Sequence, residues 1–128
     1  MSNNMYNGYK KPEEHFSVCF RDDAANDLKV KIGSMIAIEY HNGRLSMVRV
    51  NWGDDEDWER SRDGEVELNW MFDEENTKKM MRLTGTNTGK SLINVLYERF
   101  KQNAYDADSY IIRWCDTKGI VYNYYVHY

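Results

Sequence analysis

The segment with the strongest chemical signature is Gly85-Thr86-Asn87-Thr88-Gly89-Lys90-Ser91, which ends in Gly-Lys-Ser. A phosphate-binding loop has four residues between its two glycines, so that consecutive N–H groups surround a phosphate. Here three residues separate the glycines, and the preceding residues are predicted to be helical. The favoured interpretation is a turn between two helices, with Asn87 or Thr88 as the N-cap of the second. The alternative is an anion site for a nucleotide, with Asn87, Thr88, Lys90 and Ser91 as ligands.

Metal or nucleophilic chemistry would need histidines and cysteines placed close together. None of these residues shows the close-spaced ligand pairs of a structural zinc site. His15 and Cys19 are four residues apart, which on a strand separates them by roughly 13 Å. We therefore expect no metal, no cofactor and no catalytic residue, and we interpret Cys19 and Cys115 as structural.

An acidic run, Asp54-Asp55-Glu56-Asp57, lies between Trp52 and Trp58. It is not a calcium loop, because Glu59 stands where the sixth position requires glycine. Acid–base catalysis would need carboxylates that are buried or paired with a charge, and consecutive exposed acids are neither. Tryptophans beside carboxylates are typical of binding hot spots. Either ring could instead fold back onto the core.

Charge is distributed unevenly along the chain. The net charge is −4, but residues 51–76 contain eleven acids and two bases, a net of −9, and the other residues carry +5. A block of this kind repels nucleic acid and attracts basic surfaces. The alternative is that it only increases solubility.

Length and composition limit the architecture. A chain of 128 residues, 41% of them hydrophobic, forms one domain with a real core. It has no apolar stretch of about 18 residues, and its first residues are too polar for a secretory signal, so we expect a cytoplasmic protein. Residues 1–12 are expected to be a flexible arm, and residues 13–128 a single domain.

Alternating apolar residues predict a series of strands. The segments are 15–20, 28–32, 35–40, 45–50 and 65–72. Asn42-Gly43 lies between the third and fourth segments and predicts a tight hairpin, because both residues accept positive φ angles.

Helical patterns follow these strands. Asp73 is a good N-cap, and acids before lysines suit the helix dipole, so a helix is predicted over about 73–83. A second helix over 89–102 has one apolar stripe. Segments 110–115 and 120–128 are predicted as a C-terminal hairpin. The fold class is therefore α+β: a single compact domain, mainly an antiparallel sheet, with two helices inserted before that hairpin.

The tyrosines of residues 122–128 allow two interpretations. Aromatic strands can stack on bases, although that mode needs a basic groove. Tyrosine is also simply a good strand former, and this is the interpretation we favour.

The leading functional hypothesis is a small acidic, non-enzymatic binding or inhibitor protein. It would occlude a basic, nucleic-acid-handling surface of a partner protein, as immunity proteins and phage-encoded anti-defence proteins do; the comparison is one of type and not of motif. Asp54, Asp55, Glu56 and Asp57 would steer association, and Trp52 or Trp58 would be buried.

This hypothesis implies no direct contact with nucleic acid or membrane, and it allows a homodimer. The alternative is a small-ligand protein that binds an anionic nucleotide at residues 85–91 with its tyrosines. An enzyme of unknown type and a structural oligomer are further classes.

The hairpin prediction can be tested by one substitution. Gly43→Val should lower the free energy of unfolding by roughly 1 kcal/mol or more, because a β-branched residue resists a positive φ angle. Urea denaturation measures the change, and an unaltered midpoint would contradict the predicted turn.

Overall fold

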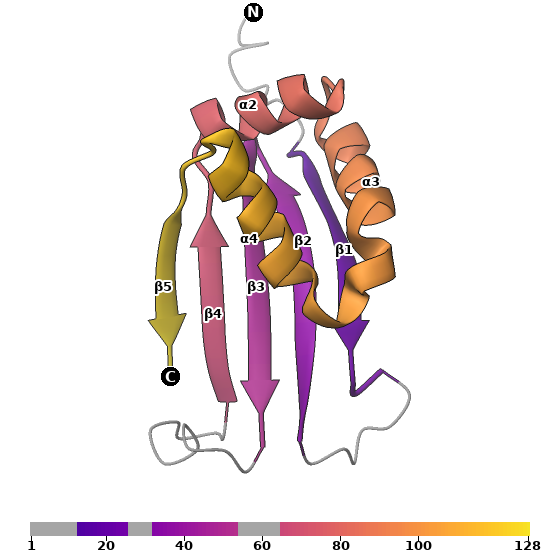
Figure 1. Cartoon of the computed structure of the whole chain (residues 1–128), viewed down its shortest axis with the longest axis vertical. Helices are drawn as coiled ribbons and strands as arrows, with labels where there is room; N and C mark the ends of the chain where they lie inside the picture. Colours follow the sequence, from indigo (N-terminus) through magenta and orange to yellow (C-terminus); the bar gives the residue numbers. More distant parts are fainter. Residues whose placement is uncertain (1–12, 26–31, 54–64) are drawn as a thin grey trace, which may run out of the picture.

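The computed structural model describes residues 13–25, 32–53 and 65–128. Within these ranges the chain forms a five-stranded antiparallel sheet with a layer of helices on one face (Figure 1). The strands are adjacent in the sheet in the same order as along the chain. They are β1 (His15–Asp22), β2 (Gly33–His41), β3 (Arg44–Trp52), β4 (Glu65–Met71) and β5 (Asn123–His127). The predicted α+β class, with a mainly antiparallel sheet in a single compact domain, is confirmed.

All the helices of the described ranges belong to the connection from β4 to β5. They are α2 (Glu74–Thr84), α3 (Gly89–Phe100), the 3₁₀ helix η2 (Lys101–Asp106) and α4 (Ala107–Lys118). Figure 1 shows that α2 crosses one end of the sheet, α3 runs back along β1, and α4 returns diagonally towards the start of β5. The chain therefore passes once over the whole sheet before it adds the last strand.

The predicted hairpin is confirmed. β2 and β3 pair from Gly33↔Trp52 to His41↔Arg44, so that two residues form the loop. Their φ angles are 48° at Asn42 and 93° at Gly43, as a tight turn with two left-handed residues requires.

The first predicted helix is also confirmed. Asp73 caps α2, since its Oδ1 accepts a hydrogen bond of 2.8 Å from the N–H of Asn76. Gly85 ends it with φ 70°. Buried Thr77 joins the helix to the sheet, because its hydroxyl accepts from the N–H of Leu45 at 3.0 Å and donates to the carbonyl of Asp73. The second predicted helix begins at Gly89 as expected, but it ends at Phe100 and continues as η2.

The predicted C-terminal hairpin is wrong in its first strand. Residues 110–115 lie inside α4, and β5 pairs with β4 rather than with them. The fully buried residues are Ala107, Ile111 and Cys115, which are four residues apart, as on one side of a helix. Gly119, with φ 70°, is the helix C-cap and not a hairpin turn.

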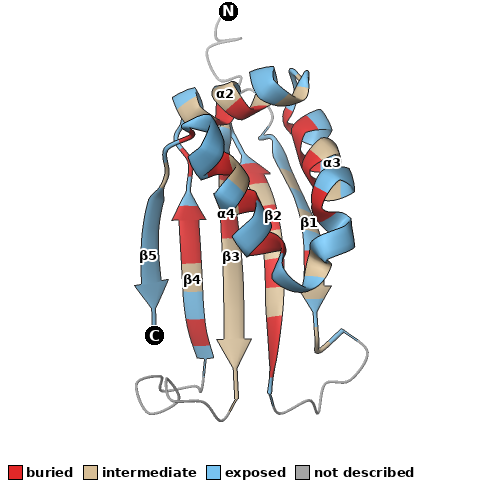
Figure 2. Ribbon diagram, viewed as in Figure 1, coloured by how far each residue is buried: buried red, intermediate tan, exposed pale blue. Residues whose placement is uncertain are grey.

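The core lies between the helices and the covered face of the sheet (Figure 2). Tyr40 from β2 packs so closely on the start of α3 that a Cβ atom at Gly89 would lie 2.2 Å from its Cε1 atom. The fully buried side chains include Ile36, Ile38, Leu45, Met47, Phe72, Met80, Leu92, Leu96, Ile111 and Cys115.

Two arginines fasten η2 and α4 to the sheet. Nη1 of Arg49 on β3 donates a hydrogen bond of 3.0 Å to Oδ1 of buried Asp108. Arg21 on β1 donates to the carbonyl of Tyr105 and lies 3.6 Å from the centre of its ring. Arg21 also bonds to Asp23 and lowers the pKa of that carboxyl. These contacts hold η2 and the start of α4 against β1 and β3, where the chain turns back across the sheet.

Some sequence predictions lie outside the described residues. They are the N-terminal arm (residues 1–12), most of the predicted strand 28–32, and the acidic run with Trp58. Of the predicted strand only Ile32 is described, and it lies outside β2 with 64% of its surface exposed.

The apolar stripe of α3 should contribute most of the helical layer's stability. Leu96 is fully buried, so Leu96→Ala should lower the free energy of unfolding by about 2–5 kcal/mol. Val121 is 66% exposed and provides the control. Val121→Ala should change the free energy of unfolding by less than about 0.5 kcal/mol. Similar urea midpoints for the two variants would contradict the position given to α3.

Candidate functional site

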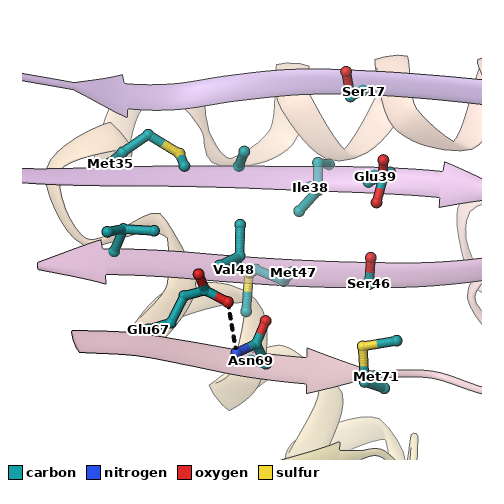
Figure 3. A pocket seen from close by; sticks show the side chains of 12 residues that line it. Ser17, Met35, Ile38, Glu39, Ser46, Met47, Val48, Glu67, Asn69 and Met71 are labelled. Carbon is teal, nitrogen blue, oxygen red and sulfur yellow. Dashed lines mark hydrogen bonds between the residues drawn. The ribbon is translucent and has the colours of Figure 1, made fainter. Parts of the chain in front are cut away.

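One face of the sheet carries none of the helices α2, α3 and α4, and we call it the open face (Figures 1 and 3). Side chains alternate along a strand, so its members follow from the register of the strands. Its centre is apolar and half-exposed, and polar groups surround that centre. The apolar residues are Met35, Ala37, Val48, Val50 and Met71, and the polar ones include Ser17, Glu39, Ser46, Glu67 and Asn69.

A cavity of about 510 Å³ lies on the open face over β1 to β4. Figure 3 shows its lining, with the flexible side chains of Met35 and Met71 at opposite sides. Methionine adapts its shape to different partners. On β4, the side-chain amide of Asn69 donates a hydrogen bond of 3.3 Å to Oε1 of Glu67. Asn69 itself is only 8% exposed.

The charges of the open face are mainly negative. The register places four carboxylates on it, those of Asp22, Glu39, Glu65 and Glu67, and one guanidinium, that of Arg44. Its net charge, with neutral histidines, is therefore −3 among the described residues. The acidic block of the sequence connects β3 to β4, whose ends carry Trp52 and Glu65.

Two histidines lie at the end of the open face near the β2–β3 turn. The rings of His15 and His41 are 5.3 Å apart in an edge-on arrangement. His15 bonds to Glu39, and His41 bonds to Glu13 at 2.7 Å. That bond from His41 lowers the pKa of Glu13. In the part of the chain that the structure describes, no group of three or more His, Cys, Asp or Glu side chains is arranged to hold a metal ion.

The two cysteines differ in their surroundings, since Cys19 is exposed and Cys115 is buried. Cys19 lies on the exposed side of β1, and its thiol donates to the carbonyl of Arg21 at 3.1 Å. Cys115 is buried in α4, and burial raises the pKa of its thiol to about 12. At neutral pH the Cys115 thiol is therefore protonated and a poor nucleophile.

Of the predicted partner-binding residues, the structure describes Trp52. It ends β3 and is half-buried, and its ring covers Gly33 so closely that a Cβ atom there would lie 2.7 Å from Cζ2. The ring lies against β2 on the open face and is not part of the buried core, so its predicted role in partner binding stays a prediction. Asp54, Asp55, Glu56, Asp57 and Trp58 lie outside the described residues.

Two of the four predicted anion-binding residues, Thr88 and Ser91, form the N-terminal cap of α3. Thr88 is the N-cap of α3, and its hydroxyl oxygen accepts a hydrogen bond of 3.1 Å from the N–H of Ser91. Gly85 ends α2, and Gly89 leaves room for the ring of Tyr40. Asn87 and Lys90 are exposed. The interpretation as a turn between helices is confirmed, and nucleotide binding there has gained no support.

Sequence reasoning missed the open face, although a signal for it exists. In β2 and β3 apolar residues occupy both alternating sets, for example Ile36 and Ile38 on one face and Met35 and Ala37 on the other. Strands of this kind have two apolar faces. The described helices cover only the first of these faces.

Comparisons with models of known protein families, with curated proteins and with solved structures give no match for this chain. None of the helices in the described ranges is long and apolar enough to cross a membrane.

Two neighbouring substitutions distinguish a packed turn from an anion site. Gly89→Ala should lower the free energy of unfolding by roughly 1–3 kcal/mol, because its Cβ would overlap the Tyr40 ring. Lys90→Ala should change it by less than about 0.5 kcal/mol, because Lys90 is exposed.

Both variants are measured by urea denaturation, and thermal unfolding is repeated with ATP and GTP. A nucleotide-dependent rise in Tm that Lys90→Ala removes would contradict the interpretation as a packed turn.

Proposed function

We propose that the protein is a non-enzymatic binding protein that covers a basic surface of a partner protein with its open face. The observation that carries this proposal is the combination of an apolar centre with surrounding carboxylates, a net charge of −3, on a sheet face that no described helix covers. Protein interfaces have this organisation, with an apolar centre inside a polar rim. The negative rim selects a basic partner by charge complementarity.

The size of the open face suits a protein partner. Five strands at about 4.8 Å spacing and about 25 Å length give an area of roughly 600 Å². A standard interface takes about 800 Å² from each partner. The face thus supplies most of a standard interface, and in the sequence Trp52 is followed by further carboxylates.

The chemistry of the partner follows from the charge. Extended basic surfaces are characteristic of proteins that handle nucleic acid. A carboxylate-rimmed face occupies such a surface in place of phosphates, and it repels nucleic acid itself. The protein would act as an inhibitor, because a covered surface cannot bind DNA or RNA.

The apolar centre provides the main test. Val48 lies in the cavity between Ala37 and Asn69 on the neighbouring strands. Val48→Arg puts a bulky cation at the centre of the face, and we expect it to weaken binding at least 100-fold. Leu83→Arg is the matched control, because Leu83 is 43% exposed on α2 and outside the open face. It should bind as the wild type does.

The wild-type protein and both variants are used to capture partners from an extract of the native host. Affinities for the captured protein are then measured with purified components, with and without a DNA or RNA oligonucleotide. The proposal requires a basic partner that still binds the Leu83→Arg variant and no longer binds the Val48→Arg variant. The oligonucleotide should displace this partner from the wild-type protein. Equal binding by both variants, or direct binding of the oligonucleotide to this protein, would contradict it.

The carboxylates should act on the association rate. Glu65→Gln combined with Glu67→Gln keeps side-chain size and removes two negative charges from the rim. The association rate should fall several-fold at low ionic strength, and the difference should vanish near 0.5 M salt, where the Debye length is about 4 Å. Stopped-flow or surface-based kinetics measure both effects, and a rate that is unchanged at low salt would remove the electrostatic part of the proposal.

A further inference from the structure

We infer that the protein associates with a second copy of itself through β5, so that two sheets join into one. The inference does not depend on the proposed function. It rests on the edge position of β5, on the direction of its backbone groups, and on its uncharged, aromatic sequence.

Among the described strands, β5 is at the edge of the sheet and has one neighbour, β4. All five of its residues, Asn-Tyr-Tyr-Val-His, are exposed. Edge strands are normally protected by lysines, prolines, bulges or a covering element, because their unpaired backbone groups can pair with another strand. β5 contains neither lysine nor proline, and its register with β4 is regular throughout.

The other edge of the sheet is protected. β1 is interrupted by a bulge between Cys19 and Arg21. Arg21 and Asp22 carry charges at this point, and Arg21 is bonded to Tyr105 of η2. The contrast between the two edges makes β5 the strand that is suited to pairing.

The alternation of the ladder shows which backbone groups of β5 point outwards. The two-residue turn makes His41↔Arg44 a hydrogen-bonded pair, so the even-numbered residues of β3 form their backbone hydrogen bonds with β2. The odd-numbered residues, from Leu45 onwards, therefore form theirs with β4. The bond from the N–H of Phe72 to the carbonyl of Leu45, 2.9 Å, has this phase. The same alternation continues through β4 to β5. The N–H and C=O groups of Tyr124 and Val126 therefore point away from the sheet.

The side chains favour a second copy as the occupant. Tyr124, Tyr125 and Val126 are 48%, 50% and 36% exposed, and none carries a charge that would repel an identical strand. An antiparallel pair centred on Tyr125 places Tyr124 opposite Val126 of the other copy on one face. Aromatic residues opposite β-branched residues stabilise antiparallel strands.

Symmetry limits the assembly to two copies. A pairing of β5 with β5 uses the same surface on both chains and closes on itself, whereas pairing of β5 with β1 would continue into a fibre. The interface is short, so we expect a reversible dimer with a Kd in the micromolar range, of order 1–100 µM. The two open faces would then lie side by side in one sheet.

The oligomeric state tests the inference. Sedimentation equilibrium of the full chain between about 1 and 500 µM, a range set around the expected Kd, should show a change from 15.3 kDa to twice that mass. Val126→Lys should give a monomer throughout, because it places charges at the new strand pair. Val121→Lys, at a 66% exposed position outside β5, is the matched control and should still dimerise.

Folding is checked by circular dichroism and by the urea midpoint of each variant. If Val126→Lys does not fold, Val126→Pro replaces it, because an edge strand tolerates proline where the lost N–H group points away from the sheet. A wild type that stays monomeric over the whole range, a dimer that survives the substitution at Val126, or masses that grow beyond two copies would overturn the inference.

A cross-link tests the register independently. In the Cys19→Ser background, Tyr125→Cys places two thiols on the two-fold axis, where opposite Cα atoms of a non-hydrogen-bonded pair are about 4.5 Å apart. That spacing suits a disulfide, which oxidised glutathione should form between the copies with reduction of the glutathione. Val121→Cys in the same background should not cross-link. Equal cross-linking of both variants would overturn the proposed register.

Discussion

The structure depends on one topological constraint: all of its described helices lie in a single connection, from β4 to β5. The connection between β2 and β3 is a two-residue hairpin that can hold no helix. One connection forms one layer, and that layer covers one face of the sheet. The apolar residues of β2 and β3 on the covered face are therefore core, whereas those on the opposite face stay partly exposed.

The packing of the helical layer shows how this constraint is met. The ring of Tyr40 occupies the space that a side chain at residue 89 would need, so α3 begins in direct contact with β2. Thr77 caps the backbone of Leu45 at the entry of β3. At the opposite end, Arg49 and Asp108 form a largely buried pair, which is costly to desolvate and depends on good geometry. Apolar contacts thus hold the middle of the layer, and specific polar contacts fix its ends.

The open face and the β5 edge are two consequences of the same arrangement. In the described part of the chain, no helix covers Met35 and Val48, and no strand pairs with the outer side of Tyr124 and Val126. Their apolar surface is instead exposed, and in the function that we propose, the carboxylates around the open face select basic partners. The two surfaces differ in character: the open face is negative and apolar, whereas β5 is uncharged and presents backbone groups.

The sequence by itself determined the elements whose signals are local. Asn42-Gly43 accepts the backbone angles of a tight turn, Asp73 caps a helix, and the stripe around Leu96 repeats with a helical period. The α+β class followed from these. The sequence did not determine residues 110–115, where a short apolar stretch fits either a strand or a helix and where Gly119 resembles a hairpin turn.

Tertiary structure alone decided what the candidate site is. Glu39 and Glu67 are 28 residues apart in the sequence, and they share a face because the register places their strands in one sheet. Alternation tells which residues of a strand point the same way, but it does not tell which of two apolar faces the helices will cover. That choice depends on contacts between distant segments, such as Tyr40 with Gly89 and Arg49 with Asp108. No local pattern contains it, because each of these contacts exists only after the chain has folded.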